Sequence, residues 1–219
     1  FTMHYLLPKE HQPKRIIKPT MSCSVFVLRL ALNTSLPMLS LHNIFLPDGT
    51  QKELESVSKG LPPLNPPLYI YYPSHVDPNF QKACPACVNV MMRVPNLCKQ
   101  KDFWANDTVH NLEELCIRKL IQITGMENLR EKILAKATST PFDLKHNFNC
   151  WQGAAFGLAP SYLQSMMFRP QIKQKKVDQL YLVGSSIHPG NGISIVMKGA
   201  KLTAQQIMLD TTRPKDRCE

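Results

Sequence analysis

Residues 180–194, LYLVGSSIHPGNGIS, are the part of this sequence best suited to bind a ligand through backbone groups. An apolar run ends at Gly184, a serine pair and His188-Pro189 follow, and Gly190-Asn191-Gly192 precedes a second apolar run. A strand, a glycine-containing turn and a helix in this order direct backbone N–H groups outward at the positive end of a helix dipole. Such a turn can hold a phosphate, a carboxylate or the electron-rich edge of a flavin ring. The spacing fits an ordinary strand-to-helix turn equally well, because no third glycine completes a dinucleotide fingerprint.

The other reactive side chains give weaker signals. His188 has no carboxylate or cysteine close to it in sequence, and a lone histidine beside proline in a turn is usually structural. Of the seven cysteines, only Cys84-Pro-Ala-Cys87 has the spacing of a metal or redox pair. No second pair accompanies it, and a strand-like run rather than a helix follows. We therefore expect no metal site, no redox function at this pair, and reduced thiols inside a cell.

The elements that must position the turn are read from hydrophobic periodicity. Three runs rich in β-branched and apolar residues, 22–32, 68–72 and 88–94, predict strands of one mixed or antiparallel sheet. A short strand is expected at 43–46. Helical spacing predicts helices over 50–60, opened by a Thr50–Glu53 capping box, over about 106–123, and over 126–137. The last part is predicted as a strand at 180–184, the glycine turn, and a helix over 193–209 with an inward stripe of Ile193, Val196, Met197, Ala200, Ala204 and Ile207.

Charge and hydropathy limit the possible partners. The formal net charge is +10, with Lys and Arg concentrated at 9–18, 169–176 and the tail. This balance favours solubility or an anionic partner. We expect an anionic membrane surface before nucleic acid, because no aromatic residues interleave the basic runs. No apolar run approaches the roughly 20 residues of a bilayer span, so membrane attachment would be peripheral. No signal peptide is visible in the sequence, and the chain is expected to be a piece of something longer.

Several stretches, in consistent order, resemble the carotenoid (phytoene/dehydrosqualene) desaturase family of flavoproteins. DQLYLVGSSIHPGNGISIVMKGAKLTA (178–204) is similar to the C-terminal signature of the family, although Asn191 and Ser194 depart from its usual pattern. GAAFGLAPSYLQSMMFRPQ (153–171) resembles the segment before that signature. The dehydrosqualene desaturase branch is resembled by SCSVFVLRLALN (22–33), HNIFL (42–46), YIYYPSHVD (69–77) and VPN (94–96).

The resemblance implies part of an FAD-dependent oxidoreductase that desaturates a linear polyene, dehydrosqualene or phytoene, in carotenoid biosynthesis. The implied fold is α/β (α+β) and comprises part of two domains. Residues 1–175 would form part of a substrate domain with a mixed β-sheet and helices, and 176–219 the C-terminal strand–turn–helix of an FAD-binding Rossmann-like domain. No G-x-G-x-x-G follows a strand anywhere in the chain, so the N-terminal half of the enzyme is expected to be missing. The chain alone is then expected to be inactive, and the enzyme to be cytoplasmic and peripheral on the membrane.

The same resemblance implies which residues contact the flavin, chiefly through backbone groups. They are Gly184, Ser185, Ser186, His188, Pro189, Gly190, Asn191, Gly192 and Ile193. No catalytic acid or base is assigned. Two alternatives stay open: a related flavin amine-oxidase-type enzyme acting on another lipid or an amine, and an inactive remnant that acts at most as a basic lipid-surface-binding module.

Overall fold

The computed structural model of the chain describes residues 6–11, 19–82, 84–98, 104, 107–174 and 177–212. The chain divides into two compact units. Unit 2 is Cys23–Ala155, and unit 1 comprises Phe1–Ser22 together with Phe156–Glu219. Unit 2 is therefore an insertion within the sequence of unit 1. The functional division at 175/176, between a substrate part and a cofactor-binding part, stays a prediction.

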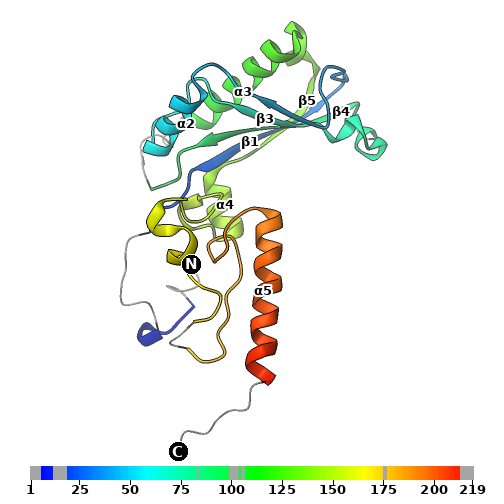
Figure 1. Ribbon diagram of the computed structural model, residues 1–219. Helices are drawn as coiled ribbons and strands as arrows, with labels where there is room; N and C mark the ends of the chain where they lie inside the picture. The colour runs from blue at the N-terminus through cyan, green and yellow to red at the C-terminus, as the bar shows by residue number, and fades with distance from the viewer. Residues whose placement is uncertain are drawn as a thin grey trace, which may run out of the picture. The chain divides into compact units, whose positions relative to one another are not determined.

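Unit 2 is built on a five-stranded sheet with the strand order β2-β3-β4-β1-β5 (Figure 1). The strands are β1 (Ser24–Leu32), β2 (His42–Phe45), β3 (Leu68–Tyr71), β4 (Ala86–Val94) and β5 (Ile133–Ser139). Every pairing between them is antiparallel, one of the two arrangements that the sequence left open. The prediction that the three β-branched runs share one sheet is confirmed, and so is the α/β class.

Alternation along the strands places one face of this sheet in a hydrophobic core. In β1 and β4 the even-numbered residues are buried, whereas most odd-numbered residues are at least partly exposed. Helix α3 (Thr108–Thr124) covers the buried face and contributes Leu112, Cys116 and Leu120 to the core (Figure 1). Full burial of a side chain such as Leu28, which is 0% exposed, contributes about 1.5–3 kcal/mol. The core is therefore the main source of stability in unit 2.

Helix α2 (Thr50–Lys59) lies where it was predicted, but the predicted capping box does not form. Gly49 is the N-cap residue, so Thr50 is the first residue inside the helix and its hydroxyl donates to the Pro47 carbonyl at 2.6 Å. The Glu53 carboxylate instead accepts hydrogen bonds from the backbone N–H groups of Leu64 and Asn65, at 2.6 and 3.0 Å. A capping box does open helix α4 (Pro141–Phe148), where the Thr140 hydroxyl accepts from the N–H of Asp143.

The helix predicted over 126–137 is wrong. Glu127–Lys132 form the 3₁₀ helix η5, and the following residues form strand β5 at the edge of the sheet. Leu129, Ile133 and Leu134 fit helical spacing, but only Leu129 of the three is buried. Pairing with β1 satisfies the backbone of this segment, and tertiary context of this kind overrides local propensity.

Short 3₁₀ helices also occur in the loops of unit 2. They are η2 (Pro73–His75), η3 (Pro78–Gln81) and η6 (Trp151–Gly153). The two ends of the unit lie side by side, because the Ala155 N–H donates to the Cys23 carbonyl at 3.3 Å.

The described part of unit 1 contains one long helix, α5 (Ile193–Thr212), and three short 3₁₀ helices. The short ones are η1 (Lys9–His11), η7 (Tyr162–Gln164) and η8 (Met166–Phe168). The strand predicted at 180–184 is wrong, because Tyr181 makes only an isolated bridge to Lys173. Within the described residues, no helix is long and apolar enough to cross a membrane.

The predicted inward stripe of α5 is also wrong. The buried residues of this helix are Gly199 and Thr203, whereas Ile193 is 85% exposed and Met197 is 68% exposed. An apolar stripe is buried only if apolar surface faces it, and the interior of unit 1 is formed mainly by polar side chains such as Gln164 and Arg169. The periodicity identified an apolar surface correctly but could not show whether this chain covers it.

Candidate functional site

The residues singled out from the sequence lie together in the turn that precedes α5. Gly184, Gly190 and Gly192 have φ angles of 141°, 147° and 99°, a region that L side chains rarely adopt. Asn191 is not among the residues with positive φ. Its departure from the family pattern therefore introduces no backbone strain into the turn.

Little protein packs against the Cα atoms of these glycines. A Cβ atom added at Gly184 or Gly192 would have no atom within 4 Å, and one at Gly190 would meet only Ile195 Cγ2, at 3.8 Å. Packing inside unit 1 therefore does not require glycine at these positions. Their φ angles do. At Gly184, which is partly exposed, and Gly192, which is exposed, the result is bare backbone that a ligand can approach closely, whereas Gly190 is buried.

Helix α5 begins directly behind this backbone. The Val196 N–H donates to the Gly192 carbonyl at 2.8 Å, which is the first bond of the helix. The N–H groups of the preceding first-turn residues have no acceptor within a helix, and the N-terminus carries about half a positive charge. Gly199 allows the helix to pack against the turn, because a Cβ there would lie 3.1 Å from Pro189 Cδ. The geometry suits an anion or an electron-rich ring edge.

Arg169 holds the opposite side of the turn. This side chain is 6% exposed, and its Nη2 donates to the Ser185 carbonyl while Nη1 donates to the Gln164 carbonyl at 3.5 Å. Burial lowers the pKa of the guanidinium. The next residue takes part as well, since the His188 N–H donates to the Pro170 carbonyl at 2.8 Å. Arg169 belongs to the family-like stretch 153–171, but nothing in the sequence pattern predicted this contact.

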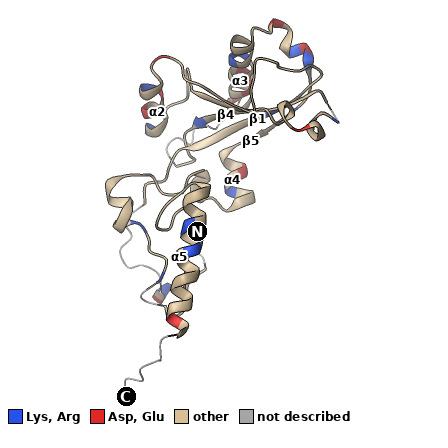
Figure 2. Ribbon diagram, turned by 45° about the vertical axis from the view of Figure 1, so that its right-hand side comes forward, with Lys and Arg blue, Asp and Glu red and all other residues tan. Residues whose placement is uncertain are grey.

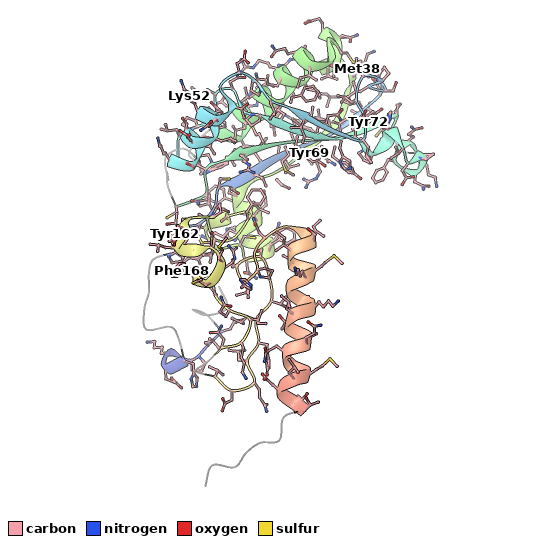
Figure 3. All side chains as sticks on the ribbon, in the orientation of Figure 1. Met38, Lys52, Tyr69, Tyr72, Tyr162 and Phe168 are labelled. Carbon is pink, nitrogen blue, oxygen red and sulfur yellow. The ribbon has the colours of Figure 1, made fainter. Side chains whose placement is uncertain are left out.

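The segment before Arg169 is held by a second buried polar side chain. Gln164 accepts the Thr20 N–H at 2.8 Å and donates to the Thr20 carbonyl at 2.9 Å. Gly157 lets the chain pass close to the serine pair, because a Cβ there would lie 2.5 Å from Ser186 Oγ. Tyr162 and Phe168 lie beside each other on η7 and η8, with ring centroids 5.8 Å apart (Figure 3).

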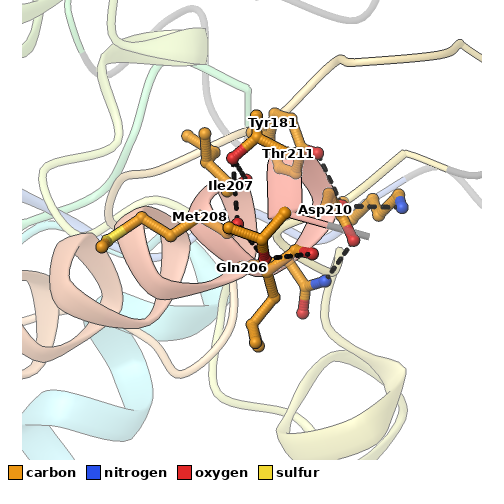
Figure 4. A network of polar contacts seen from close by, with 9 residues as sticks. Tyr181, Gln206, Ile207, Met208, Asp210 and Thr211 are labelled. Carbon is orange, nitrogen blue, oxygen red and sulfur yellow. Dashed lines mark hydrogen bonds and ion pairs between the residues drawn. The ribbon is translucent and has the colours of Figure 1, made fainter. Parts of the chain in front are cut away.

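A polar network fixes the far end of α5 (Figure 4). The Asp210 carboxylate accepts from the Tyr181 hydroxyl at 2.6 Å, from Lys173 Nζ at 2.7 Å and from Gln206 Nε2 at 3.0 Å. The bond from Lys173, followed by that from Tyr181, lowers the pKa of Asp210 to about 2, and the contact with Asp210 raises the pKa of Tyr181. The helix is thereby tied to the segment that leads into the turn.

His188 contributes a structural contact. Its Nδ1 lies 3.3 Å from the Met166 carbonyl oxygen, in an exposed position. This contact joins the turn to η8 and agrees with the structural interpretation of a histidine beside proline.

Comparison with known proteins gives a relationship over nearly the whole chain. A 4,4'-diapophytoene desaturase (4,4'-diaponeurosporene-forming) of Staphylococcus haemolyticus is 29% identical over 209 residues, which cover 94% of this chain and 42% of the relative. The protein of the same name from Staphylococcus aureus strain Newman is 28% identical over 208 residues, covering 94% of this chain and 41% of the relative. The chain is a relative of the 4,4'-diapophytoene desaturases. No protein-family model matches it.

The chain spans about two fifths of the length of these desaturases. The match covers 94% of the chain, and the uncovered remainder is too short to reach from the C-terminus back to the turn before α5. The turn is therefore included in the match. The resemblance seen in the sequence is therefore confirmed, and the turn lies within the related region. The part that its residues play is a separate question.

Proposed function

We propose that this chain is part of an FAD-dependent desaturase of a linear polyene such as 4,4'-diapophytoene. The similarity to 4,4'-diapophytoene desaturases over 94% of the chain supports this function best. The names of these relatives favour a polyene over the amine or other lipid of an amine-oxidase-type enzyme.

In this proposal residues 184–193 hold the isoalloxazine ring of the flavin. The open backbone at Gly184 and Gly192 allows close approach, and the start of α5 presents N–H groups to the electron-rich edge of the ring. Arg169, which donates to the Ser185 carbonyl, keeps the turn in place from the side away from the ligand space. When bound, FAD supplies the hydride acceptor, and the protein orients the substrate and excludes water.

Unit 2 offers a surface suited to the polyene. The sheet face opposite the core carries Tyr69 and Tyr71 of β3, with Met91 paired to Tyr69 on the neighbouring strand. The His42 ring stacks on both tyrosines, with centroids 6.1 and 5.4 Å away, and its Nδ1 lies 2.8 Å from the Tyr69 hydroxyl. Aromatic and thioether side chains bind a conjugated apolar chain through broad dispersion contacts. Figure 3 shows Tyr69 on this sheet.

We further propose that the rest of the enzyme supplies the phosphate-binding side and covers the apolar surface of unit 1. Large apolar side chains are exposed on η7, η8 and α5: Tyr162, Leu163, Met166, Met167, Phe168, Ile193, Ile195, Met197, Ile207, Met208 and Leu209. Exposed apolar side chains in this number are typical of an interaction site. This chain alone is then expected to bind FAD weakly, and stoichiometric flavin absorbance of the purified chain would contradict that expectation.

The decisive experiment pairs flavin occupancy with stability. The chain is joined to the portion of the S. haemolyticus desaturase that the match does not cover, and Gly192→Val is introduced. At Gly192 the added side chain meets no protein atom within 4 Å, so it would enter the ligand space. We expect loss of FAD and of polyene desaturation, whereas Asn191→Gly should retain or improve flavin binding.

An ordinary turn gives a different result. Strain at φ 99° would then lower the stability of the FAD-free protein by about 1–3 kcal/mol, and occupancy would fall only in proportion. Normal occupancy at normal stability would remove 184–193 from the cofactor site. An inactive remnant would bind no FAD even when joined, and the sequence that precedes Phe1 in the gene would then lack a strand followed by G-x-G-x-x-G.

Peripheral contact with an anionic membrane surface is part of the proposal. Its support is the formal net charge of +10. Each Lys or Arg near such a surface contributes about 1 kcal/mol. Much of this charge lies outside the described residues, and α5 itself carries only Lys198, Lys201 and Asp210 (Figure 2). Equal co-sedimentation with neutral and anionic vesicles would contradict an electrostatic attachment.

A further inference from the structure

The structure brings together the thiols of Cys84 and Cys87, at the point where η3 ends and β4 begins. Their Sγ atoms are 3.3 Å apart. Cysteines whose side chains diverge cannot be bridged without backbone movement, but these two face each other, and a disulfide bond of about 2.05 Å requires an approach of only about 1.2 Å. A redox role was not expected from the sequence, because a strand-like run rather than a helix follows the pair. Spacing does not show that the two side chains point toward each other.

Local hydrogen bonds hold this pair in position. The Cys87 N–H donates to Ser74 Oγ at 2.9 Å, and Ser74 is itself buried. The Cys84 thiol donates to the Ala86 carbonyl at 3.3 Å, and the Cys87 sulfur lies 3.7 Å from the Phe80 carbonyl. Cys84 is 6% exposed, whereas Cys87 is partly exposed. One thiol is therefore accessible to a reagent, and the other lies directly behind it.

We propose that Cys84 and Cys87 form a reversible disulfide on reaction with a small aliphatic disulfide. The Cys87 thiolate attacks one sulfur of the reagent, forms a mixed disulfide and releases one thiol. The Cys84 thiolate then attacks Cys87 Sγ, the second reagent thiol leaves, and the Cys84–Cys87 bond is complete. The two protein thiols lose two electrons and two protons, and the reagent gains them as two thiols.

The surroundings favour a lasting disulfide over a catalyst of thiol exchange. Cys87 lies in strand β4, so the pair lacks the helix N-terminus that lowers the thiol pKa in exchange enzymes. Burial, followed by the hydrogen bond with Cys84, raises the pKa of Cys87. A thiol with a raised pKa is seldom a thiolate at neutral pH and is a poor leaving group, so the bond forms slowly and resists attack once formed.

A metal explains the pair less well. Within the described part of the chain, no group of three or more His, Cys, Asp or Glu side chains is placed to hold an ion. Structural zinc needs four ligands. The pair therefore fits a two-electron change between its own sulfurs better than coordination.

The test uses the whole chain, oxidised glutathione as the reagent, and peptide mass spectrometry. Trypsin releases 83–93, which contains these two cysteines and no other, and 94–99, which contains the exposed Cys98. After oxidation we expect 83–93 to lose two hydrogen atoms and both alkylation sites, and dithiothreitol to restore them. Peptide 94–99 serves as the internal control and should carry a glutathione adduct.

Single substitutions separate the steps. Cys84→Ser should stop at a glutathione adduct on Cys87, and Cys87→Ser should leave the buried Cys84 unmodified. Cys116→Ser, which removes a thiol whose pKa is about 12, should leave the reaction of 83–93 unchanged. Tryptophan fluorescence under reducing conditions confirms that each variant is folded. A wild-type 83–93 that keeps both alkylation sites, carries glutathione, or links to another chain would overturn the proposal.

Discussion

The two units of this chain differ in the kind of side chain that they bury. In unit 2 a sheet and the helix α3 enclose apolar side chains that include Phe26, Leu28 and Ile70, each 0% exposed. Among the described residues of unit 1, the buried side chains are polar, namely Ser22, Gln164, Arg169 and Thr203, and many of the large apolar residues are exposed. Burying a polar group is tolerable only when it is hydrogen-bonded, so unit 1 depends on specific bonds where unit 2 depends on packing.

This difference separates folding from binding. Unit 2 contains what a stable domain needs, whereas unit 1 displays the open turn and an apolar surface that suits a partner. Apolar side chains that stay exposed contribute no burial free energy, so a region that exposes them is less stable on its own. The contrast can be tested directly, because both tryptophans, Trp104 and Trp151, lie in unit 2 and report on that unit alone.

The largest effect is expected from Leu28→Ala. This substitution leaves a cavity in the core of unit 2 and should lower its free energy of unfolding by about 2–5 kcal/mol. Urea titration followed by tryptophan fluorescence measures the change. The matched control is Met197→Ala on the exposed side of α5, which should change stability by no more than about 0.5 kcal/mol. Similar losses for the two variants would contradict the contrast between the units.

A smaller and local effect is expected from Arg169→Met. The change removes charged donors from the Ser185 and Gln164 carbonyls, and such bonds contribute about 1.5–3 kcal/mol. Hydrogen exchange should become faster at Ile187 and His188, whose N–H groups bond within this region. Arg169→Lys keeps the charge but not the forked geometry, so its exchange rates should lie between those of the wild type and those of Arg169→Met. If Arg169→Met also shifted the urea midpoint measured by tryptophan fluorescence, which reports on unit 2, the two units would not be energetically separate.

The smallest effect is expected at Asp210 and depends on pH. Its folded-state pKa is about 2, below the ordinary value of 3.8, so its contribution to stability is complete above pH 4 and is lost as pH falls toward 2. Hydrogen exchange at the C-terminal end of α5, corrected for intrinsic rates, should lose protection across this window. Asp210→Asn should remove the pH dependence, whereas Thr211→Ala should retain it. Identical profiles for the Asn variant and the wild type would exclude the network as its cause.

Hydrophobic periodicity was enough to predict most of the sheet. Runs rich in β-branched and apolar residues marked β1, β3 and β4 as strands of one sheet, and helical spacing predicted α3. Strand β5 was missed, because its apolar residues also fit a helix and only pairing with β1 decides between the two.

The position of the candidate site in the sequence was predictable, but the contacts between its residues and the rest of unit 1 were not. Glycine spacing located the turn, whereas the arginine behind it binds backbone carbonyls, which look the same at every position of a sequence. The contact between Cys84 and Cys87 occurs where the Cys87 backbone N–H bonds to Ser74, thirteen residues away, and no spacing rule contains such a long-range contact. The capping box failed at Thr50 for a similar reason, since the helix began one residue earlier than the motif requires.

The insertion of unit 2 within unit 1 sets an order of events during translation. The Thr20 backbone pairs with the side chain of Gln164, yet all of unit 2 is synthesised between them. On the ribosome the N-terminal segment therefore emerges long before its partner exists, and unit 2 can complete its core while that segment is still unpaired with Gln164. Unit 1, with its polar interior and its exposed turn, becomes the last part of this chain to assemble.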